Sequence, residues 1–339
     1  MNASCLPTRS AACALSVCLS LSLIHNTLEA QTRPGLEPVV VTATRTETRV
    51  DDAIAEVTVI PRSELGRSAG LSLSQILSQS PGIQSSALGG LGQPGSLFIR
   101  GMESRHTLLL VDGIRLGFVD SGQPTLNNLP LASLDRIEVV RGPLSALYGA
   151  DAAAGVIQLF TQSAEPRLRG QASLTAGSLA HRQADVGVSW KSDRFDLSAH
   201  VSSLAQRGIS ATNANNRTNT GYCADSGCTN FVSKPVHDPD ADGIRQHSGI
   251  LKFGVQLSEH WRADLLAMES LAHVDFDDGL DVDARLRLKT AVQRLLVSGQ
   301  PRPGLKTRIS LGESRDEYLT LASFFLRGPN QPTGAASAP

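Results

Sequence analysis

The stretch from Ile99 to Phe160 decides the fold, because its short apolar runs are each closed by turn residues. Its segments are IRG at 99–101, LLLVDGIR at 108–115, DRIEVVRGP at 135–143, LYGAD at 147–151 and GVIQLF at 155–160. Gly, Asp-Gly and Gly-Pro end these runs, and such residues terminate strands and form turns. The stretch therefore predicts short strands joined by small helical pieces.

From Gly170 onward the sequence alternates between apolar and polar residues, which predicts strands with one apolar and one polar face. A membrane β-barrel with a polar lumen has this pattern, and a soluble β-sandwich has the same period. Trp190 to Phe195 is a tight turn, whereas Ala205 to His247 is a very long polar connection, as in barrels with short periplasmic turns and long outer loops. The alternating segments are Ala172–Ala176, Ala184–Trp190, Phe195–Val201, Leu251–Leu257, Trp261–Ala267, Leu305–Leu311 and, more weakly, Ala291–Val297.

The first 30 residues predict a cleaved secretory leader. Arg9 precedes a mostly apolar run, Ala11 to Ile24, and small residues lead to a cleavage site after Ala30. A buried helix is the alternative. The net charge is −1, from 31 basic and 32 acidic residues, so charge indicates neither a nucleic acid nor an acidic membrane surface as partner.

Two cysteines, Cys223 and Cys228, follow the leader and lie in the polar run Ser210 to Asn230. We expect them to form a loop-stapling disulfide in an oxidising compartment, with two free thiols as the alternative. A zinc site is not indicated, because no second Cys or His pair lies at the usual spacing.

Taken in order, these motifs resemble the plug domain of TonB-dependent outer-membrane receptors, and within that family the receptors for cobalamin (vitamin B12). The resemblance covers about Glu37 to Asp283. It implies a mainly β protein, with an N-terminal α+β plug at 57–165 and the first strands of a transmembrane antiparallel β-barrel at 170–326. The plug and the leader favour this barrel over a sandwich. The family implies active import of a scarce large nutrient, which the resemblance predicts to be cobalamin, driven by the periplasmic coupling protein TonB.

Other functions are weighed against this expectation. An enzyme is not indicated, because there is no nucleophile elbow, metal-binding histidine motif or phosphate loop. A ferric-siderophore receptor is the alternative within the family, and a truncated remnant or binding protein without transport is the alternative outside it. Mixed charges in the plug are interpreted as structural ion pairs that face the polar barrel wall. They are Arg100, Asp112, Arg115, Asp135, Arg136, Glu138 and Arg141.

The length favours the remnant. Receptors with a plugged lumen have about 22 strands, whereas the residues from Gly170 onward supply about seven alternating segments. The pattern stops after Leu319, and 327–339 is predicted to be low-complexity coil or a shifted reading frame. We expect a truncation or frameshift near Thr320, with a genuine small receptor as the alternative.

The segment Glu37-Pro38-Val39-Val40-Val41-Thr42-Ala43, within the linker at 31–56, favours extended backbone. An extended segment near a terminus can add to another protein's sheet edge. By resemblance it is the Ton box, the element that engages TonB in the periplasm.

Two acidic loops match the calcium-binding loops of cobalamin receptors. Carboxylates at alternate positions before Gly243 can converge on a hard cation such as Ca²⁺. A further family aspartate is replaced near Ile209 and Ser210, and an acidic solvated loop is the alternative. The matching residues are Asp238, Asp240, Asp242, Asp275 and Asp283.

Nutrient contacts in the family come from the outward loops of the plug, which correspond here to Leu88–Ser96, Glu103 and Asp120–Gly122. Gly and Ser offer backbone and hydroxyl hydrogen bonds to a large, amide-fringed corrinoid. The predicted contact residues are Pro94, Ser96, Glu103, Ser121 and Gly122.

Overall fold

A computed structural model describes residues 39–40, 42 and 48–322, except 69, 88, 94, 120–122, 125, 127, 210–219, 224–230, 235–240 and 278–282. The chain divides into Met1–Pro38 and Val39–Pro339, and the described residues belong to the second unit. The predicted leader and the predicted tail at 327–339 therefore lie outside the described residues. In the described part, the helices are too short or too polar to cross a membrane.

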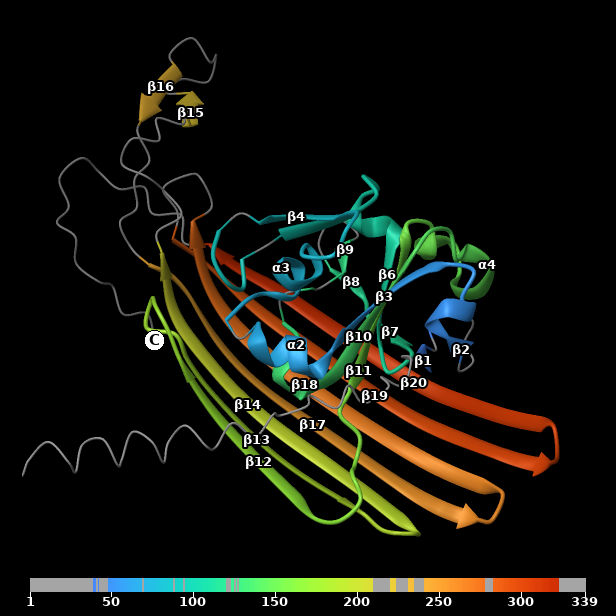
Figure 1. The fold of residues 1–339 in the computed structure, drawn as a ribbon. Coiled ribbons are helices and arrows are strands. Elements are labelled where there is room, and N and C mark those ends of the chain that lie inside the picture. Colours follow the sequence, from blue (N-terminus) through green and yellow to red (C-terminus); the bar gives the residue numbers. More distant parts are fainter. Residues whose placement is uncertain are drawn as a thin grey trace, which may run out of the picture. The chain divides into compact units, whose positions relative to one another are not determined.

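A five-stranded sheet, called the plug sheet below, forms the centre of the region predicted to be the plug, 57–165 (Figure 1). Its order is β3-β10-β11-β6-β7, with β11 parallel to β6 and the other neighbours antiparallel. Asp112 and Gly113 form the β6–β7 turn with positive φ, as the Asp-Gly pair predicts. The strands are β3 (Glu56–Pro61), β6 (Thr107–Val111), β7 (Ile114–Arg115), β10 (Leu134–Arg141) and β11 (Gly155–Thr161).

Short helices and hairpins surround this sheet. Ser72 and Gln75 form a capping box that starts α3. The elements are α2 (Arg62–Arg67), α3 (Leu73–Leu77), α4 (Ser145–Tyr148), the 3₁₀ turns η1 (Val50–Asp52), η2 (Ser104–His106), η3 (Leu131–Ser133) and η4 (Ala150–Ala152), and the paired strands β1 (Val39–Val40) with β2 (Thr48–Arg49), β4 (Ile83–Ala87) with β5 (Gly95–Ile99), and β8 (Phe118–Val119) with β9 (Gln123–Pro124).

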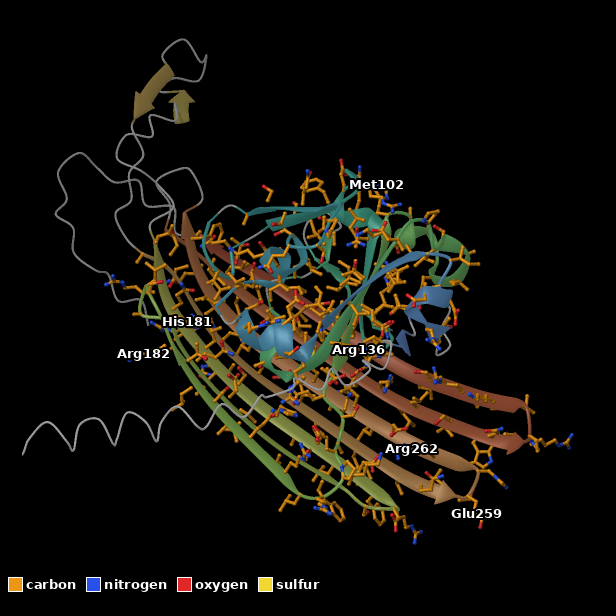
Figure 2. All side chains as sticks on the ribbon, viewed as in Figure 1. Met102, Arg136, His181, Arg182, Glu259 and Arg262 are labelled. Atoms are coloured by element: carbon orange, nitrogen blue, oxygen red, sulfur yellow. The ribbon has the colours of Figure 1, made fainter. Side chains whose placement is uncertain are left out.

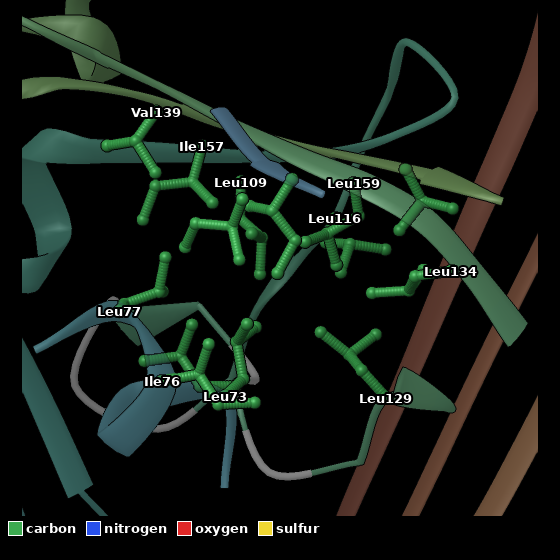
Figure 3. Packing of buried hydrophobic residues seen from close by; sticks show 14 of the residues in the cluster. Leu73, Ile76, Leu77, Leu109, Leu116, Leu129, Leu134, Val139, Ile157 and Leu159 are labelled. Atoms are coloured by element: carbon green, nitrogen blue, oxygen red, sulfur yellow. The ribbon is translucent and has the colours of Figure 1, made fainter. Parts of the chain in front are cut away.

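The main core lies between α3 and one face of the five-stranded sheet. Figure 3 shows Leu73, Ile76 and Leu77 of α3 facing Leu109, Ile157 and Leu159 of the strands. A second buried cluster covers the other face, where α4 and Val57 pack on the alternate strand residues Leu108, Leu110, Val140 and Val156. Both faces of the plug sheet are therefore buried.

Seven antiparallel strands form a second sheet in the order β12-β13-β14-β17-β18-β19-β20, seen as long neighbouring arrows in Figure 1. The predicted plug followed by about seven antiparallel strands is confirmed. Among the described strands the sheet does not close, since β12 and β20 each pair on one side. The strands are β12 (Arg169–Ala176), β13 (Arg182–Lys191), β14 (Phe195–Ile209), β17 (Asp242–Ser258), β18 (Trp261–Asp277), β19 (Asp283–Arg302) and β20 (Leu305–Ala322).

The strands are longer than the alternating segments predicted. β14 extends to Ile209, which pairs with Asp242 of β17, so the long connection is shorter than 205–247. The short strands β15 (Thr220–Cys223) and β16 (Phe231–Lys234) pair within that connection. The segment predicted as weak, Ala291–Val297, belongs to the 20-residue strand β19. Its inward side is covered by the plug, so apolar residues occupy both faces and blur the alternation.

Candidate functional site

The predicted coupling segment is docked on the plug sheet. Val39 and Val40 form β1 and pair with Arg49 and Thr48 of β2. Beyond them Thr42 is fully buried. Val41 and Ala43, like Glu37 and Pro38, lie outside the described residues. The structure therefore places the described part of this segment against its own domain.

Thr42 is held at three atoms. Its backbone N–H and its hydroxyl donate to the Glu138 carboxylate at 2.9 and 2.7 Å, and the hydroxyl also lies 3.1 Å from the Gln158 side-chain oxygen. The Tyr148 hydroxyl donates to the Thr42 carbonyl at 2.9 Å. Hydrogen bonds to a charged acceptor are stronger than neutral ones, so one residue fixes the segment.

Glu138 is the centre of this docking site. It lies on β10 opposite Gln158 of β11, and its side chain has no exposed surface. Arg136, labelled in Figure 2, donates to Glu138 at 2.9 Å and stacks on the Phe160 ring at 3.9 Å. A buried carboxylate needs such partners, because burial without them is costly. Both residues belong to the charged set predicted to form structural ion pairs, and this contact confirms the pairing, but Glu138 faces Thr42 rather than the predicted polar wall.

Two of the predicted nutrient-contact residues lie on the hairpin and turn at one end of the plug. Ser96 is on β5 opposite Ser86, and Glu103 is exposed and paired with Arg105 at 2.7 Å. Met102, labelled in Figure 2, is exposed beside Glu103. Pro94, Ser121 and Gly122 lie outside the described residues. The nutrient assignment of all five stays a prediction.

The loop before β5 packs on the end of the seven-stranded sheet. Gln93 donates to the Asp275 carbonyl at 2.7 Å. A Cβ on Gly92, whose φ is +86°, would lie 2.5 Å from the end of the Ile244 side chain, so the backbone conformation favours glycine and a larger residue would displace Ile244. This contact joins a predicted nutrient loop to a strand end that carries a predicted calcium ligand.

The predicted calcium ligands are only partly described. Asp242 is buried at the start of β17, and Asp275 lies near the end of the neighbouring β18 with Arg285 at 3.5 Å. Asp283 begins β19, but its side chain is not described. Asp238 and Asp240 lie outside the described residues. Across the described positions, no group of three or more His, Cys, Asp or Glu residues gathers. The calcium set stays a prediction.

The predicted disulfide also stays a prediction. Cys223 is the last residue of β15, with its side chain outside the described residues, and Cys228 lies in the undescribed segment 224–230.

One flank of the plug is bonded closely to strands β17–β20. Asn128 is fully buried, and it donates to the Ser270 carbonyl at 2.9 Å and to the Thr290 hydroxyl at 3.3 Å. Its own oxygen accepts from Ser270 at 2.9 Å and from Gln246 at 3.3 Å. One plug residue thus binds side chains on three strands of the sheet.

An ion pair strengthens the same flank. Lys252 of β17 lies 3.2 Å from the Asp112 carboxylate and donates to the Thr161 carbonyl at 2.7 Å. Arg294 of β19 donates to the Asp112 carbonyl. Further along, Asp316 of β20 accepts from the Gly117 amide at 2.8 Å. The predicted pairing of Asp112 with the polar wall is confirmed.

The other flank, against β12–β14, contains cavities. One, of about 270 Å³, lies between plug leucines such as Leu65 and Leu129 and polar sheet residues such as Ser173 and Asp185, and it reaches Ile244 of β17. A second, of about 230 Å³, is lined by Gln162, Glu165 and His200. Gln171 of β12 lines both. The two flanks of the plug therefore differ in how firmly they meet the sheet.

The inward face of the sheet stays polar near its turn ends. Arg262, labelled in Figure 2, pairs with Asp196 and donates to Asp264 at 2.8 Å. Gly254 lies between these residues, where a Cβ would meet the Arg262 guanidinium. By contrast Val186, Val201 and Leu251 are exposed on the outward face. This combination of an apolar outer face and a polar inner face fits a sheet with lipid outside and water inside.

Residues 49–156 match the family model of the TonB-dependent receptor plug domain. The vitamin B12 transporter BtuB of Vibrio vulnificus strain CMCP6 is 41% identical over 161 residues, which cover 48% of this chain and 26% of that protein. The BtuB of Vibrio cholerae serotype O1 is 31% identical over 242 residues, or 70% of this chain and 36% of that protein. The chain thus spans about a quarter to a third of the length of these relatives.

Solved structures share the fold. The ferric enterobactin receptor PfeA of Pseudomonas aeruginosa matches 77% of this chain and 41% of its own, with a TM-score of 0.61 and 21% identity. The alcaligin outer-membrane receptor FauA of Bordetella pertussis matches 84% of this chain and 42% of its own, with a TM-score of 0.62 and 14% identity. At these identities the likeness concerns the fold alone.

Proposed function

Because this chain belongs to the TonB-dependent receptors of the Gram-negative outer membrane, we propose that it binds cobalamin and imports it with energy coupled through TonB. The plug supports a gated transporter rather than a surface receptor. It packs Ile250, Leu266, Met268 and Val292 of the sheet into its own core, so it occupies the inner side of the sheet. A folded domain in that position must rearrange before a large solute can pass.

The choice of cobalamin rests on sequence relatives. The curated relatives named above are vitamin B12 transporters at 31% and 41% identity, whereas the siderophore receptors resemble this chain in fold at 14% and 21% identity. Competition for binding to the full chain between labelled cobalamin and ferric siderophores tests the assignment. Displacement by unlabelled cobalamin alone supports it, and displacement by a ferric siderophore alone replaces it with iron import.

Coupling through the segment 37–43 has its own test. Val40→Pro removes a backbone N–H and fixes φ in a strand that TonB would extend. We expect cobalamin uptake to be abolished in a Gram-negative host that lacks its own cobalamin receptor, while cobalamin binding is retained. Val40→Ala, which keeps the N–H, is the matched control. Uptake by the proline variant would remove the coupling assignment.

Calcium is proposed as a structural ion of the acidic loops. Its support is the alternation of Asp238, Asp240 and Asp242 and the position of Asp242 and Asp275 on neighbouring strands. Calorimetric titration of the full chain with Ca²⁺ should give heat that disappears in the double variant Asp240→Asn, Asp242→Asn. Glu259→Gln, in the turn at the other end of β17, is the control. Unchanged heat in the double variant would exclude this site.

A further inference from the structure

We infer that the plug stays hinged on strands β17–β20 and opens on the side of β12–β14, so that the nutrient passes between the plug and those three strands. This inference rests on the proposed import function. It assigns a path and a hinge to a domain whose two flanks differ in the structure.

The hinge flank is held by buried, charge-assisted and networked contacts. Asn128 has four hydrogen-bond contacts to Gln246, Ser270 and Thr290. Lys252 binds both Asp112 and Thr161. Four sheet residues also join the plug core there. Removing one member of such a network leaves the others buried without partners, so this flank resists separation.

Apart from the chain segment 162–168, which joins the plug to β12, the described ties on the opening flank are fewer and weaker. Its described hydrogen bonds between plug and strands are three. Arg62 donates to the Gln171 side-chain oxygen, the Gln171 amide donates to the Gln162 side-chain oxygen at 3.0 Å, and the Ser198 hydroxyl donates to the Gln162 carbonyl at 3.4 Å. Arg62 and Gln171 lie on exposed or partly exposed surfaces, where hydrogen bonds exchange readily with water. Local opening is drawn from such regions of low stability.

The cavities on this flank line up along the strands. The 270 Å³ cavity begins near Gly70 and Ile244, and the 230 Å³ cavity continues to Ser163 and Glu165, where the plug leads into the sheet. A small cavity lined by Ser133, Gln171 and His200 lies between them. Pockets for drug-sized ligands measure about 300–1,000 Å³, so a large nutrient needs this gap to widen.

The strand side of the gap suits a solute rich in hydrogen-bonding groups. It presents amide and hydroxyl side chains and the Asp185 carboxylate, while the plug side presents leucines and Arg62. The absence of a side chain at Gly187 leaves room for His200 and Gln171 in the gap. A Cβ at Gly187 would lie 2.4 Å from the His200 ring and 2.8 Å from the Gln171 amide. The polar residues along β12–β14 are Gln171, Ser173, Thr175, Gln183 and Ser202.

Two equally buried serines report on the two flanks. Ser198 of β14 is 1% exposed beside Gln162, and Ser270 of β18 is 0% exposed beside Asn128. In the full chain with all five cysteines replaced by serine, Ser198→Cys and Ser270→Cys are treated with a small methanethiosulfonate reagent at rising urea concentration. We expect Ser198→Cys to react at least tenfold faster than Ser270→Cys below the urea concentration that unfolds the sheet.

Equal rates at every urea concentration would show that the plug leaves as one body, and faster reaction at Ser270→Cys would place the hinge on the wrong flank. Either result overturns the inference. His200→Cys and Thr290→Cys, two buried positions with one on each flank, serve if a first variant fails to fold. These measurements require no transport.

Reversible crosslinks then connect the hinge to import. A short bifunctional thiol reagent joins Gln162→Cys to Gln171→Cys on the opening flank, or Arg115→Cys to Ser314→Cys on the hinge flank, where the Ser314 hydroxyl donates to the Arg115 carbonyl. We expect the first crosslink to lower cobalamin uptake at least tenfold, with recovery on reduction, and the second to change it less than twofold. The opposite order overturns the path. If the uncrosslinked chain binds cobalamin without uptake, the import proposal fails while the thiol rates still decide the hinge.

Discussion

The plug sheet and the seven-stranded sheet contain the same apolar residue types, but the plug sheet is buried on both faces whereas the seven-stranded sheet is exposed on its outward face. In the plug sheet, Leu108 and Leu109 point to opposite faces and both are buried, because one cluster covers each face. In the long strands, Ile250 is buried inward while its neighbour Leu251 is 44% exposed outward. Continuous apolar runs therefore mark a sheet covered on both faces, and alternation marks a sheet whose outer side meets another solvent.

The largest expected effect is a difference in destabilisation between the plug core and the outward face of the long strands. Ile157→Asp places a carboxylate without partners in the plug core, which costs several kcal/mol, on the order of 5, and should abolish the protease resistance of the plug. Val201→Asp, on the outward face, should cost about 2 kcal/mol or less. Limited proteolysis and calorimetry of both variants check this. Equal damage would mean that the outward face is packed like a core.

The next effect concerns the joint between the two sheets. Lys252→Met leaves the buried Asp112 carboxylate without its ammonium partner, and we expect a loss of about 3–5 kcal/mol of stability. Adding Asp112→Asn removes the stranded charge and should recover more than half of that loss. Thermal unfolding of the single and double variants gives the comparison. A single variant as stable as the parent would show that the joint carries no charge coupling.

The smallest effect concerns the docked segment. Thr42→Val removes the hydroxyl from Glu138 and Gln158 and should weaken docking by about 1 kcal/mol. Cleavage of the segment by added protease should then be about fivefold faster, since about 1.4 kcal/mol corresponds to a factor of ten. Thr42→Ser keeps the hydroxyl and should behave like the parent. Equal cleavage of all three proteins would mean that other contacts hold the segment.

Local pattern was enough to predict many of the elements but few of the contacts between them. The run LLLVDGIR predicted β6, its Asp-Gly turn and β7, because strand and turn preferences act over a few residues. Neither Asn128 nor Thr42 carries such a signal, since their partners lie 142 and 96 residues away along the chain. Glu138 and Gln158 offered an indirect one, as polar residues within otherwise apolar strands. The ends of β19 were missed because the plug contributes apolar contacts on the inward side.

The edge position of β3 determines how the plug sheet would yield to mechanical load. Among the described strands β3 pairs only with β10, and the pairing runs from Glu56 with Arg141 to Pro61 with Arg136. A pull transmitted from residues 39–55 reaches the Glu56 end first, where Arg100 and Arg141 both bind its carboxylate. Once that clamp breaks, the remaining pairs separate one at a time, as in a zipper, and require less force than strands sheared together.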